Sequence, residues 1–269
     1  MAENKIRLDI LLTDRGLIES RSLAQRQVMA GQVRVDGQVV IKPSAKVNPE
    51  AIIAIEQAPR FVSRGGDKLE PALAAFHLTD LTGLICADIG ASTGGFTDCM
   101  LQYGAACVYA IDVGYGILHW KMRSDPRVVV MERTNARYVQ LLPQPVNLIT
   151  IDASFISLRV LLPVCRAWFG VSGGRVIALI KPQFEAGRKD AAKNDGVIRD
   201  HGVHRRVLEE VLEFVQAEGY SVSGLMRSPV VGPKGNIEFL VLLEYPALIQ
   251  ELNVYQRITE LMEELETVN

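Results

Sequence analysis

The sequence predicts an α/β fold in which a small α+β domain precedes a doubly wound parallel sheet. Three observations predict this fold. From about residue 61, continuous apolar runs alternate with helical stretches, which is typical of a parallel sheet covered by helices. Residues 1–60 show two short helical patterns and a hairpin signal instead. A glycine-rich loop follows the first apolar run of the larger part, as in strand-to-helix turns that bind ligands.

The first 60 residues are predicted to form the small domain. The leucines within 8–17 follow a helical spacing, and Ser20 or Ser22 is a suitable cap for a second helix. Valines alternate on both sides of Asp36-Gly37, a strong signal for a two-residue hairpin turn. A further strand is expected at 51–55.

The larger part is predicted to contain seven strands separated by helices. The expected strands are Leu84–Ile89, Cys107–Asp112, Val128–Met131, Asn147–Ile151, Arg175–Ile180, Ser221–Arg227 and Glu238–Leu243. The clearest helical stretches are Gly95–Tyr103, Leu158–Trp168 and His204–Glu218. Because the loop Ser228–Ile237 has no helical pattern, we expect the last two strands to form an antiparallel hairpin.

Composition excludes several classes of protein. Apolar residues make up 48% and charged residues 22%, which is ordinary for a soluble globular chain. We see neither an apolar run long enough to span a membrane nor a signal peptide. The four cysteines form no CxxC pair, and the four histidines do not combine with them at metal-ligand spacing, so a reduced cytoplasmic protein without a metal is expected. We expect His201 and His204 at the surface.

Charge is unevenly distributed along the chain. The overall formal charge is −2, but residues 1–60 hold nine basic and seven acidic residues. Residues 247–269 hold five acidic residues and one arginine, and are predicted to form an acidic C-terminal helix. The overall charge therefore does not exclude a nucleic-acid partner.

The segment ICADIGASTGGFTDCML predicts a cofactor site. Gly90, Gly94 and Gly95 allow tight turns and let a ligand approach backbone N–H groups at a helix N-terminus. Asp112 ends the next strand, 22 residues after Gly90, close to the interval that places a carboxylate on a ribose. Since Asp88 would repel a phosphate, an adenosyl ligand with ammonium and sulfonium groups fits best. An ordinary strand-to-helix turn is the alternative.

Four ionisable residues stand where a sheet-edge active site would collect them. Lys68 opens the helix before the first strand, Asp152 and Lys181 end the fourth and fifth strands, and Glu238 starts the last. Carboxyl ends of parallel strands form the ligand crevice, so Asp152 and Lys181 should face the cofactor. A ribose hydroxyl must lose its proton as it attacks a methyl group, and a lysine could accept that proton. Ordinary ion pairing at strand ends is the alternative.

The stretches DIGASTGGFTD, IDASFIS, LIKPQFEAGR and the N-terminal RLDILL resemble the TlyA/hemolysin A family. That family joins an S-four-type RNA-binding domain to an FtsJ-like methyltransferase, and the resemblance covers most of 5–245. It implies a Rossmann-like methyltransferase sheet with a small N-terminal α+β RNA-binding domain. It also implies S-adenosylmethionine-dependent 2′-O-methylation of cytidine in ribosomal RNA of the small subunit, the large subunit, or both. The implied partners are ribosomal RNA and ribosomal subunits.

The resemblance also implies domain bounds and residue roles. The implied domains are an S-four-type domain at 1–60, a linker at 61–67, a methyltransferase domain at 68–246 and the acidic helix at 247–269. FtsJ-like enzymes use a Lys-Asp-Lys-Glu tetrad, which matches Lys68, Asp152, Lys181 and Glu238. Cofactor-binding positions carry over to Asp88, Gly90, Ser92, Gly94, Gly95, Phe96 and Asp112, with Asn135 near the adenine.

Arginines of the small domain are the expected RNA contacts. Arg21 and Arg26 lie near the start of the second helix and Arg34 lies on the hairpin, where guanidinium groups can bind phosphates. Arg7 is predicted to be a further RNA contact, with an ordinary solvent-exposed residue as the alternative. In the larger part, 186–200 is expected to be a polar lid that turns Arg188 toward phosphate.

Three remaining questions stay open at this point. Phe184 either stacks on the target base or packs in the core. A non-catalytic RNA-binding ribosome-assembly factor is the alternative function. A pore-forming toxin, suggested by the family's hemolysin name, conflicts with the missing membrane-spanning run.

Overall fold

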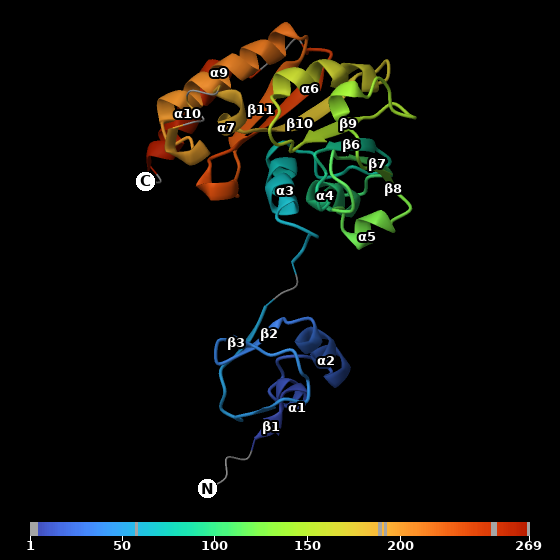
Figure 1. Ribbon diagram of the computed structural model, residues 1–269, viewed down its shortest axis with the longest axis vertical. Coiled ribbons are helices and arrows are strands. Elements are labelled where there is room, and N and C mark those ends of the chain that lie inside the picture. The colour runs from blue at the N-terminus through green and yellow to red at the C-terminus, as the bar shows by residue number, and fades with distance from the viewer. Residues whose placement is uncertain (1–4, 57–58, 188–189, 191–192, 249–251, 268–269) are drawn as a thin grey trace. The chain divides into compact units, whose positions relative to one another are not determined.

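The computed structural model describes residues 5–56, 59–187, 190, 193–248 and 252–267 (Figure 1). The chain divides into two compact units, Met1–Arg60 and Phe61–Asn269. Each unit has its own hydrophobic core and is described separately below.

The first unit is a small α+β domain, as predicted. Ser20 caps the second helix, since its Oγ accepts a hydrogen bond from the backbone N–H of Leu23 at 3.3 Å. Asp36 and Gly37 have φ values of 49° and 81°, which fit the predicted hairpin turn. The elements are β1 (Ile6–Arg7), α1 (Leu8–Asp14), α2 (Arg21–Met29), β2 (Val33–Val35), β3 (Gln38–Val39), β4 (Lys46–Val47) and β5 (Ile53–Ile55).

The second unit contains all seven predicted strands, with bounds within about two residues of the prediction. The strands are β6 (Ile85–Ile89), β7 (Cys107–Ile111), β8 (Val128–Met131), β9 (Leu148–Ile151), β10 (Gly174–Ile180), β11 (Ser221–Arg227) and β12 (Phe239–Tyr245). The helices are α3 (Gly65–Ala75), α4 (Gly95–Gln102), α5 (Trp120–Arg123), α6 (Leu158–Cys165), α7 (Pro182–Glu185), α9 (His201–Ala217) and α10 (Val254–Thr267). Short 3₁₀ turns lie at Ala136–Tyr138, Arg166–Trp168, Lys193–Gly196 and Pro233–Gly235.

These strands form one sheet in the order β11-β12-β10-β9-β6-β7-β8. Strands β10, β9, β6, β7 and β8 run parallel, and β12 pairs antiparallel with both β10 and β11. The predicted antiparallel hairpin is confirmed. Because β12 runs opposite to its neighbours, its first residue lies at the edge where the parallel strands end.

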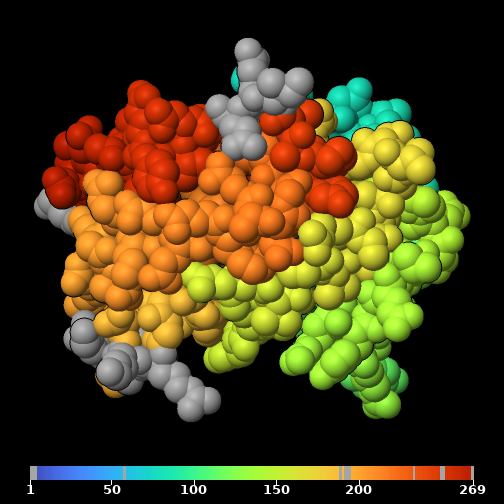
Figure 2. All heavy atoms as spheres, turned by 90° about the horizontal axis from the view of Figure 1, so that it is seen from above, coloured from blue at the N-terminus to red at the C-terminus, as the bar shows by residue number. Residues whose placement is uncertain are grey.

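Helices cover both faces of the sheet (Figure 1). The core on one face is built with α3 and α4, and the core on the other face with α6, α9 and α10. Figure 2 shows the orange α9 and the red α10 side by side over that second face. None of the helices within the described ranges is long and apolar enough to cross a membrane.

The structure corrects one expectation in α9. His204 is completely buried, although we expected it at the surface. Asp200 caps the helix through the N–H of Gly202, and the first turn packs His204 against Phe239 with Nε2 3.2 Å from the Ile198 carbonyl oxygen. Burial lowers the pKa of His204 to about 4. Nothing in the sequence indicated this burial, because a histidine near the start of a helix is usually exposed.

Candidate active site

Sheet register brings the four predicted ionisable residues to one edge of the sheet. Ile180 pairs with Phe239 in the antiparallel ladder, so Lys181 and Glu238 are the next neighbours beyond it. Ile89 pairs with Ile151, so Asp152 lies beside Gly90 at the same edge. We refer to Lys68, Asp152, Lys181 and Glu238 as the charged tetrad.

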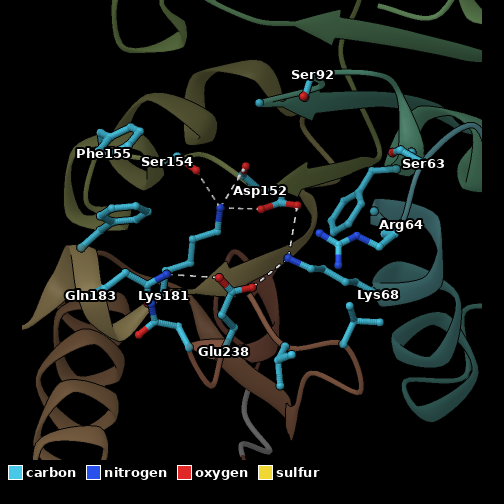
Figure 3. Close-up of a pocket in the computed structure, with 18 of the residues that line it drawn as sticks. Ser63, Arg64, Lys68, Ser92, Asp152, Ser154, Phe155, Lys181, Gln183 and Glu238 are labelled. Atoms are coloured by element: carbon cyan, nitrogen blue, oxygen red, sulfur yellow. Dashed lines mark hydrogen bonds and ion pairs between the residues drawn. The ribbon is translucent and has the colours of Figure 1, made fainter. Parts of the chain in front are cut away.

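The charged tetrad forms a continuous row of ion pairs (Figure 3). Lys68 Nζ lies 2.8 Å from Glu238 Oε2 and 3.9 Å from Asp152 Oδ2. Lys181 Nζ lies 2.6 Å from Asp152 Oδ1. The Glu238 side chain is completely buried and the two lysine side chains are at most 10% exposed. Buried charges are tolerated when they are paired in this way, so the row is held together as one unit.

Two further polar residues touch the charged tetrad, and neither was predicted from the sequence. Ser154 Oγ accepts a hydrogen bond from Lys181 Nζ at 3.1 Å, and the Asp152 carbonyl oxygen lies 3.4 Å from the same nitrogen. Gln183 Nε2 donates to Glu238 Oε1 at 3.2 Å. Lys181 therefore has three acceptors around Nζ, and each carboxylate oxygen of Glu238 has a donor.

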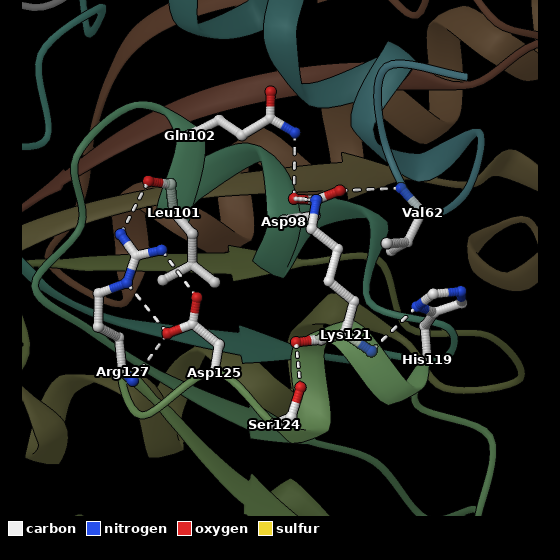
Figure 4. A network of polar contacts seen from close by, with 9 residues as sticks. All are labelled: Val62, Asp98, Leu101, Gln102, His119, Lys121, Ser124, Asp125 and Arg127. Carbon is white, nitrogen blue, oxygen red and sulfur yellow. Dashed lines mark hydrogen bonds and ion pairs between the residues drawn. The ribbon is translucent and has the colours of Figure 1, made fainter. Parts of the chain in front are cut away.

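A network around Asp98 fixes the segment that carries Lys68 (Figure 4). Asp98 of α4 is 2% exposed and accepts hydrogen bonds from the N–H of Val62 at 2.9 Å and from Gln102 at 3.1 Å. A Cβ on Gly95 would lie 2.8 Å from the backbone nitrogen of Gly66, so glycine is needed for this close approach. Phe61 is buried, and α3 begins at Gly65, three residues before Lys68.

A cavity of about 680 Å³ opens beside the charged tetrad. Gly90, Ser92, Gly95 and Phe96 line this cavity, as do all four residues of the tetrad. A second cavity of about 460 Å³ is lined by Ser92, Asp112 and Asn135. The two cavities share Gly90, Ser92, Asp152, Ser154 and Phe155, so they adjoin at the glycine loop.

The glycine loop is shaped by backbone contacts. Gly90 has a φ of 83°, and a Cβ there would lie 2.7 Å from the Asp152 carbonyl oxygen, so only glycine fits. Gly94 has a φ of 97° and begins the turn into α4, packed against Met122. Asp112 accepts hydrogen bonds from the backbone N–H groups of Ser92 and Gly114, at 2.8 and 2.7 Å. Asp112 thus ties the loop to the end of β7.

Asp88 lies beneath this loop and lines neither cavity. It is completely buried, and its carboxylate accepts hydrogen bonds from Thr97 Oγ1 at 2.6 Å and Thr150 Oγ1 at 3.1 Å. Burial raises the pKa of Asp88 to about 7, although the two threonine hydroxyls lower it. A direct contact between Asp88 and a bound ligand stays a prediction.

Two aromatic rings stand at the mouth of the larger cavity. Phe155 is 90% exposed and has a φ of 63°, which is unusual for an aromatic residue. Its ring centroid lies 4.9 Å from that of Phe184, whose ring lies 5.9 Å from Lys181 Nζ. Glu185 fixes the two segments to each other, since it accepts hydrogen bonds from Ser157 Oγ and the N–H of Leu158. Phe155 and Phe184 both line the larger cavity. Phe155 was not predicted from the sequence.

The predicted RNA-binding arginines of the first unit differ in their surroundings. Arg7 and Arg21 both pair with the buried carboxylate of Asp9. Arg34 pairs with Glu56, and Arg26 is exposed. Arg188 lies outside the described residues. Within those residues, no group of three or more His, Cys, Asp or Glu side chains is arranged to hold a metal.

Comparisons with known proteins agree on one family. A family model of FtsJ-like methyltransferases matches residues 61–245, and a model of the S4 domain matches residues 6–53. The chain is 49% identical to "Putative rRNA methyltransferase YqxC" of Bacillus subtilis, covering 93% of this chain and 90% of the relative. It is 41% identical to the 16S/23S rRNA (cytidine-2′-O)-methyltransferase TlyA of Mycobacterium tuberculosis, covering 89% and 90%.

A solved structure is similar along the whole chain. "Putative hemolysin from Streptococcus thermophilus" superposes with a TM-score of 0.72 at 42% identity, covering 99% of each chain. The family model spans the sheet, the glycine loop and the charged tetrad. The chain therefore belongs to the FtsJ-like methyltransferase family, with an S4 domain at its N-terminus.

Proposed function

We propose that this chain transfers the methyl group of S-adenosylmethionine to the 2′-hydroxyl of a cytidine in ribosomal RNA. The charged tetrad beside the glycine-loop cavity carries this proposal. The cytidine-2′-O specificity named for the Mycobacterium tuberculosis relative supports the choice of target. Ribosomal RNA as substrate also makes the cytoplasm the place of action.

The residues around the two cavities fit S-adenosylmethionine. The smaller cavity offers Asp112 and Asn135 for the ribose and adenine, and the glycine loop leads from it to the charged tetrad. Asp152 lies where the cavities adjoin, and its negative charge suits a positively charged methyl donor. When bound, the cofactor would supply an activated methyl group on sulfur.

Lys181 is the proposed general base. Lys181 Nζ would take the proton of the 2′-hydroxyl as that oxygen accepts the methyl group, after it has passed its own ammonium proton to Asp152 Oδ1, 2.6 Å away. Asp152 and Ser154 hold that nitrogen in place, at 2.6 and 3.1 Å. Lys68 and Glu238 form the second pair of the row and orient Asp152 from its other oxygen.

The aromatic pair at the cavity mouth suits an unstacked base. A ribose inside a paired helix is hard to reach, so RNA enzymes splay the target nucleotide out and stack its base on aromatic rings. We propose that Phe155 and Phe184 provide this stacking surface. The S4 domain supplies the separate contact with structured RNA.

Methyl transfer from tritiated cofactor to bacterial ribosomal subunits tests the proposal. Lys181→Ala should lower kcat roughly 100- to 10,000-fold, the usual contribution of a general base. Lys181→Arg should be equally inactive, because a guanidinium keeps the positive charge but cannot accept a proton. RNA binding and cofactor binding of both variants serve as controls for folding. Equal incorporation by the wild type and Lys181→Ala would defeat the assigned mechanism, whereas no incorporation by the wild type would favour a non-catalytic assembly factor.

A further inference from the structure

In the first unit, two of the predicted RNA-binding arginines, Arg7 and Arg21, share one completely buried carboxylate. Asp9, in the first turn of α1, is 0% exposed and accepts four hydrogen bonds from three side chains. Arg7 donates two, from Nε at 3.0 Å and from a terminal amino group at 2.9 Å. Arg21 Nε donates at 3.0 Å and Gln25 at 2.8 Å. The hydrogen bond from Arg7 is the largest cause that holds the pKa of Asp9 well below its usual range, against the opposing effect of burial.

The two arginines come from different elements but meet at one oxygen atom. Arg7 precedes α1 and Arg21 begins α2, and both contact Asp9 Oδ2. Their side chains stay 39% and 52% exposed. Arg21 gives only Nε to Asp9, and its terminal amino groups have no other partner among the described residues. The structure therefore holds two guanidinium groups side by side with donors still facing solvent.

We propose that Asp9 is a positioning residue for RNA binding, which holds Arg7 and Arg21 together as a preformed site for a backbone phosphate. This inference rests on the proposed RNA-binding role of the first unit. Two guanidinium groups around one carboxylate leave a net positive charge, and guanidinium donors match phosphate oxygens. Neither arginine is itself buried, so the site is open to a ligand.

Preorganisation gives the physical reason. An arginine side chain loses rotamer freedom when it is fixed, and a ligand that must order it binds more weakly for that reason. Asp9 fixes both arginines before RNA arrives. The same carboxylate also weakens the positive potential that attracts RNA. Positioning and simple electrostatics thus predict opposite effects when the charge of Asp9 is removed.

Asp9→Asn tests which effect dominates, with binding of the full chain to purified bacterial ribosomal subunits as the measurement. Positioning predicts a roughly tenfold larger Kd, because the RNA would then have to order both arginines itself. Asp14→Asn is the matched control, because Asp14 is an exposed acid at the end of the same helix. That control should bind RNA as well as the wild type or slightly better.

Two further measurements distinguish a positioning role of Asp9 from a loss of RNA binding caused by misfolding. They are the salt dependence of binding and the charge-conserving variant Arg21→Lys. The slope of log Kd against log salt should stay unchanged in Asp9→Asn, because the number of cations is the same, and should fall by about 1 in Arg21→Ala. Arg21→Lys keeps the charge but loses the planar fork, so we expect weaker binding even where Asp9→Asn does not fold. Measurements are made below the unfolding transition of each variant.

Two outcomes overturn the inference, in distinguishable ways. If Asp9→Asn or Arg21→Lys binds RNA as tightly as the wild type while Arg21→Ala is weaker, the arginine contacts stand and the positioning role of Asp9 is wrong. If Arg7→Ala and Arg21→Ala both bind normally, the proposed RNA contact of these arginines fails, and the positioning role fails with it.

Discussion

Asp9 in the first unit and Asp88 in the second are both completely buried carboxylates, yet their surroundings drive their charge in opposite directions. Asp9 is surrounded by two arginines and a glutamine, and its pKa lies far below the usual value. Asp88 instead accepts hydrogen bonds from uncharged donors of Thr97 and Thr150, and burial raises its pKa to about 7. Burial alone therefore does not set the charge of a carboxylate; the available partners do.

The positions of Asp9 and Asp88 in their units explain why the two carboxylates have different hydrogen-bond partners. Asp9 lies in the first turn of a helix, close enough to the surface for long arginine side chains to reach it. Asp88 lies on β6, between β7 and β9 in the middle of the sheet, where hydroxyls on adjacent elements are its neighbours. Glu238 of the charged tetrad resembles Asp9, since it is buried and paired with a cation.

The largest loss of stability should follow from removing Lys68, the cation that pairs with Glu238. Lys68→Met leaves the buried Glu238 without its ion-pair partner, which typically costs about 3–5 kcal/mol of unfolding free energy. Methyl transfer should fall at least about 100-fold at the same time. Unfolding in urea can be followed by tryptophan fluorescence, because both tryptophans, Trp120 and Trp168, lie in the second unit.

A double variant provides the control for this loss. Lys68→Met combined with Glu238→Gln removes both charges, so it should recover much of the stability while remaining inactive. A Lys68→Met protein as stable as the wild type would show that Glu238 does not need a cation, and the likeness to Asp9 would be wrong.

Asp88→Asn should have a smaller effect that depends on pH. Because its pKa is raised to about 7 in the folded state, the wild-type residue contributes stability below pH 4 that is lost as pH rises through 7. The variant should therefore be more stable than the wild type at pH 8, by roughly 2–4 kcal/mol, and the difference should vanish toward pH 4. Urea unfolding at pH 5, 6, 7 and 8 measures this. Parallel stability curves for the two proteins would refute the raised pKa.

An exposed carboxylate should show almost no effect. Glu264 on α10 is 53% exposed and pairs with Arg257 at 2.9 Å. Glu264→Gln should change the unfolding free energy by no more than about 0.5 kcal/mol, since solvent screens such pairs. The same urea series across pH is the measurement. A loss larger than 1 kcal/mol would mean that partners matter as much at the surface as in the interior.

Most of the strands were predictable because they are continuous apolar runs, and this local signal is strong in a parallel sheet. Val128–Met131 and Ser221–Arg227 have the predicted bounds. Convergence of Asp152 and Lys181 was also predictable, because parallel strands end at one edge. The position of β12 between β10 and β11 was not, since strand order depends on packing between distant segments.

The polar details of the site were less accessible. Ser154 and Gln183 look ordinary in the sequence, and their importance comes from partners 27 and 55 residues away. Phe155 adopts a positive φ that no local pattern indicates. Arg7 and Arg21 were recognisable as cations, but nothing in the sequence distinguishes their common partner Asp9 from any other acid at a helix start.

β12 enters the sheet between β10 and β11, and the residue before it supplies the last carboxylate of the row. During synthesis, a polypeptide that has emerged as far as β10 already holds the glycine loop but lacks this carboxylate. A polypeptide that ends before β12 therefore lacks the carboxylate that pairs with Lys68, so the charged tetrad is complete only in a chain that extends past residue 238.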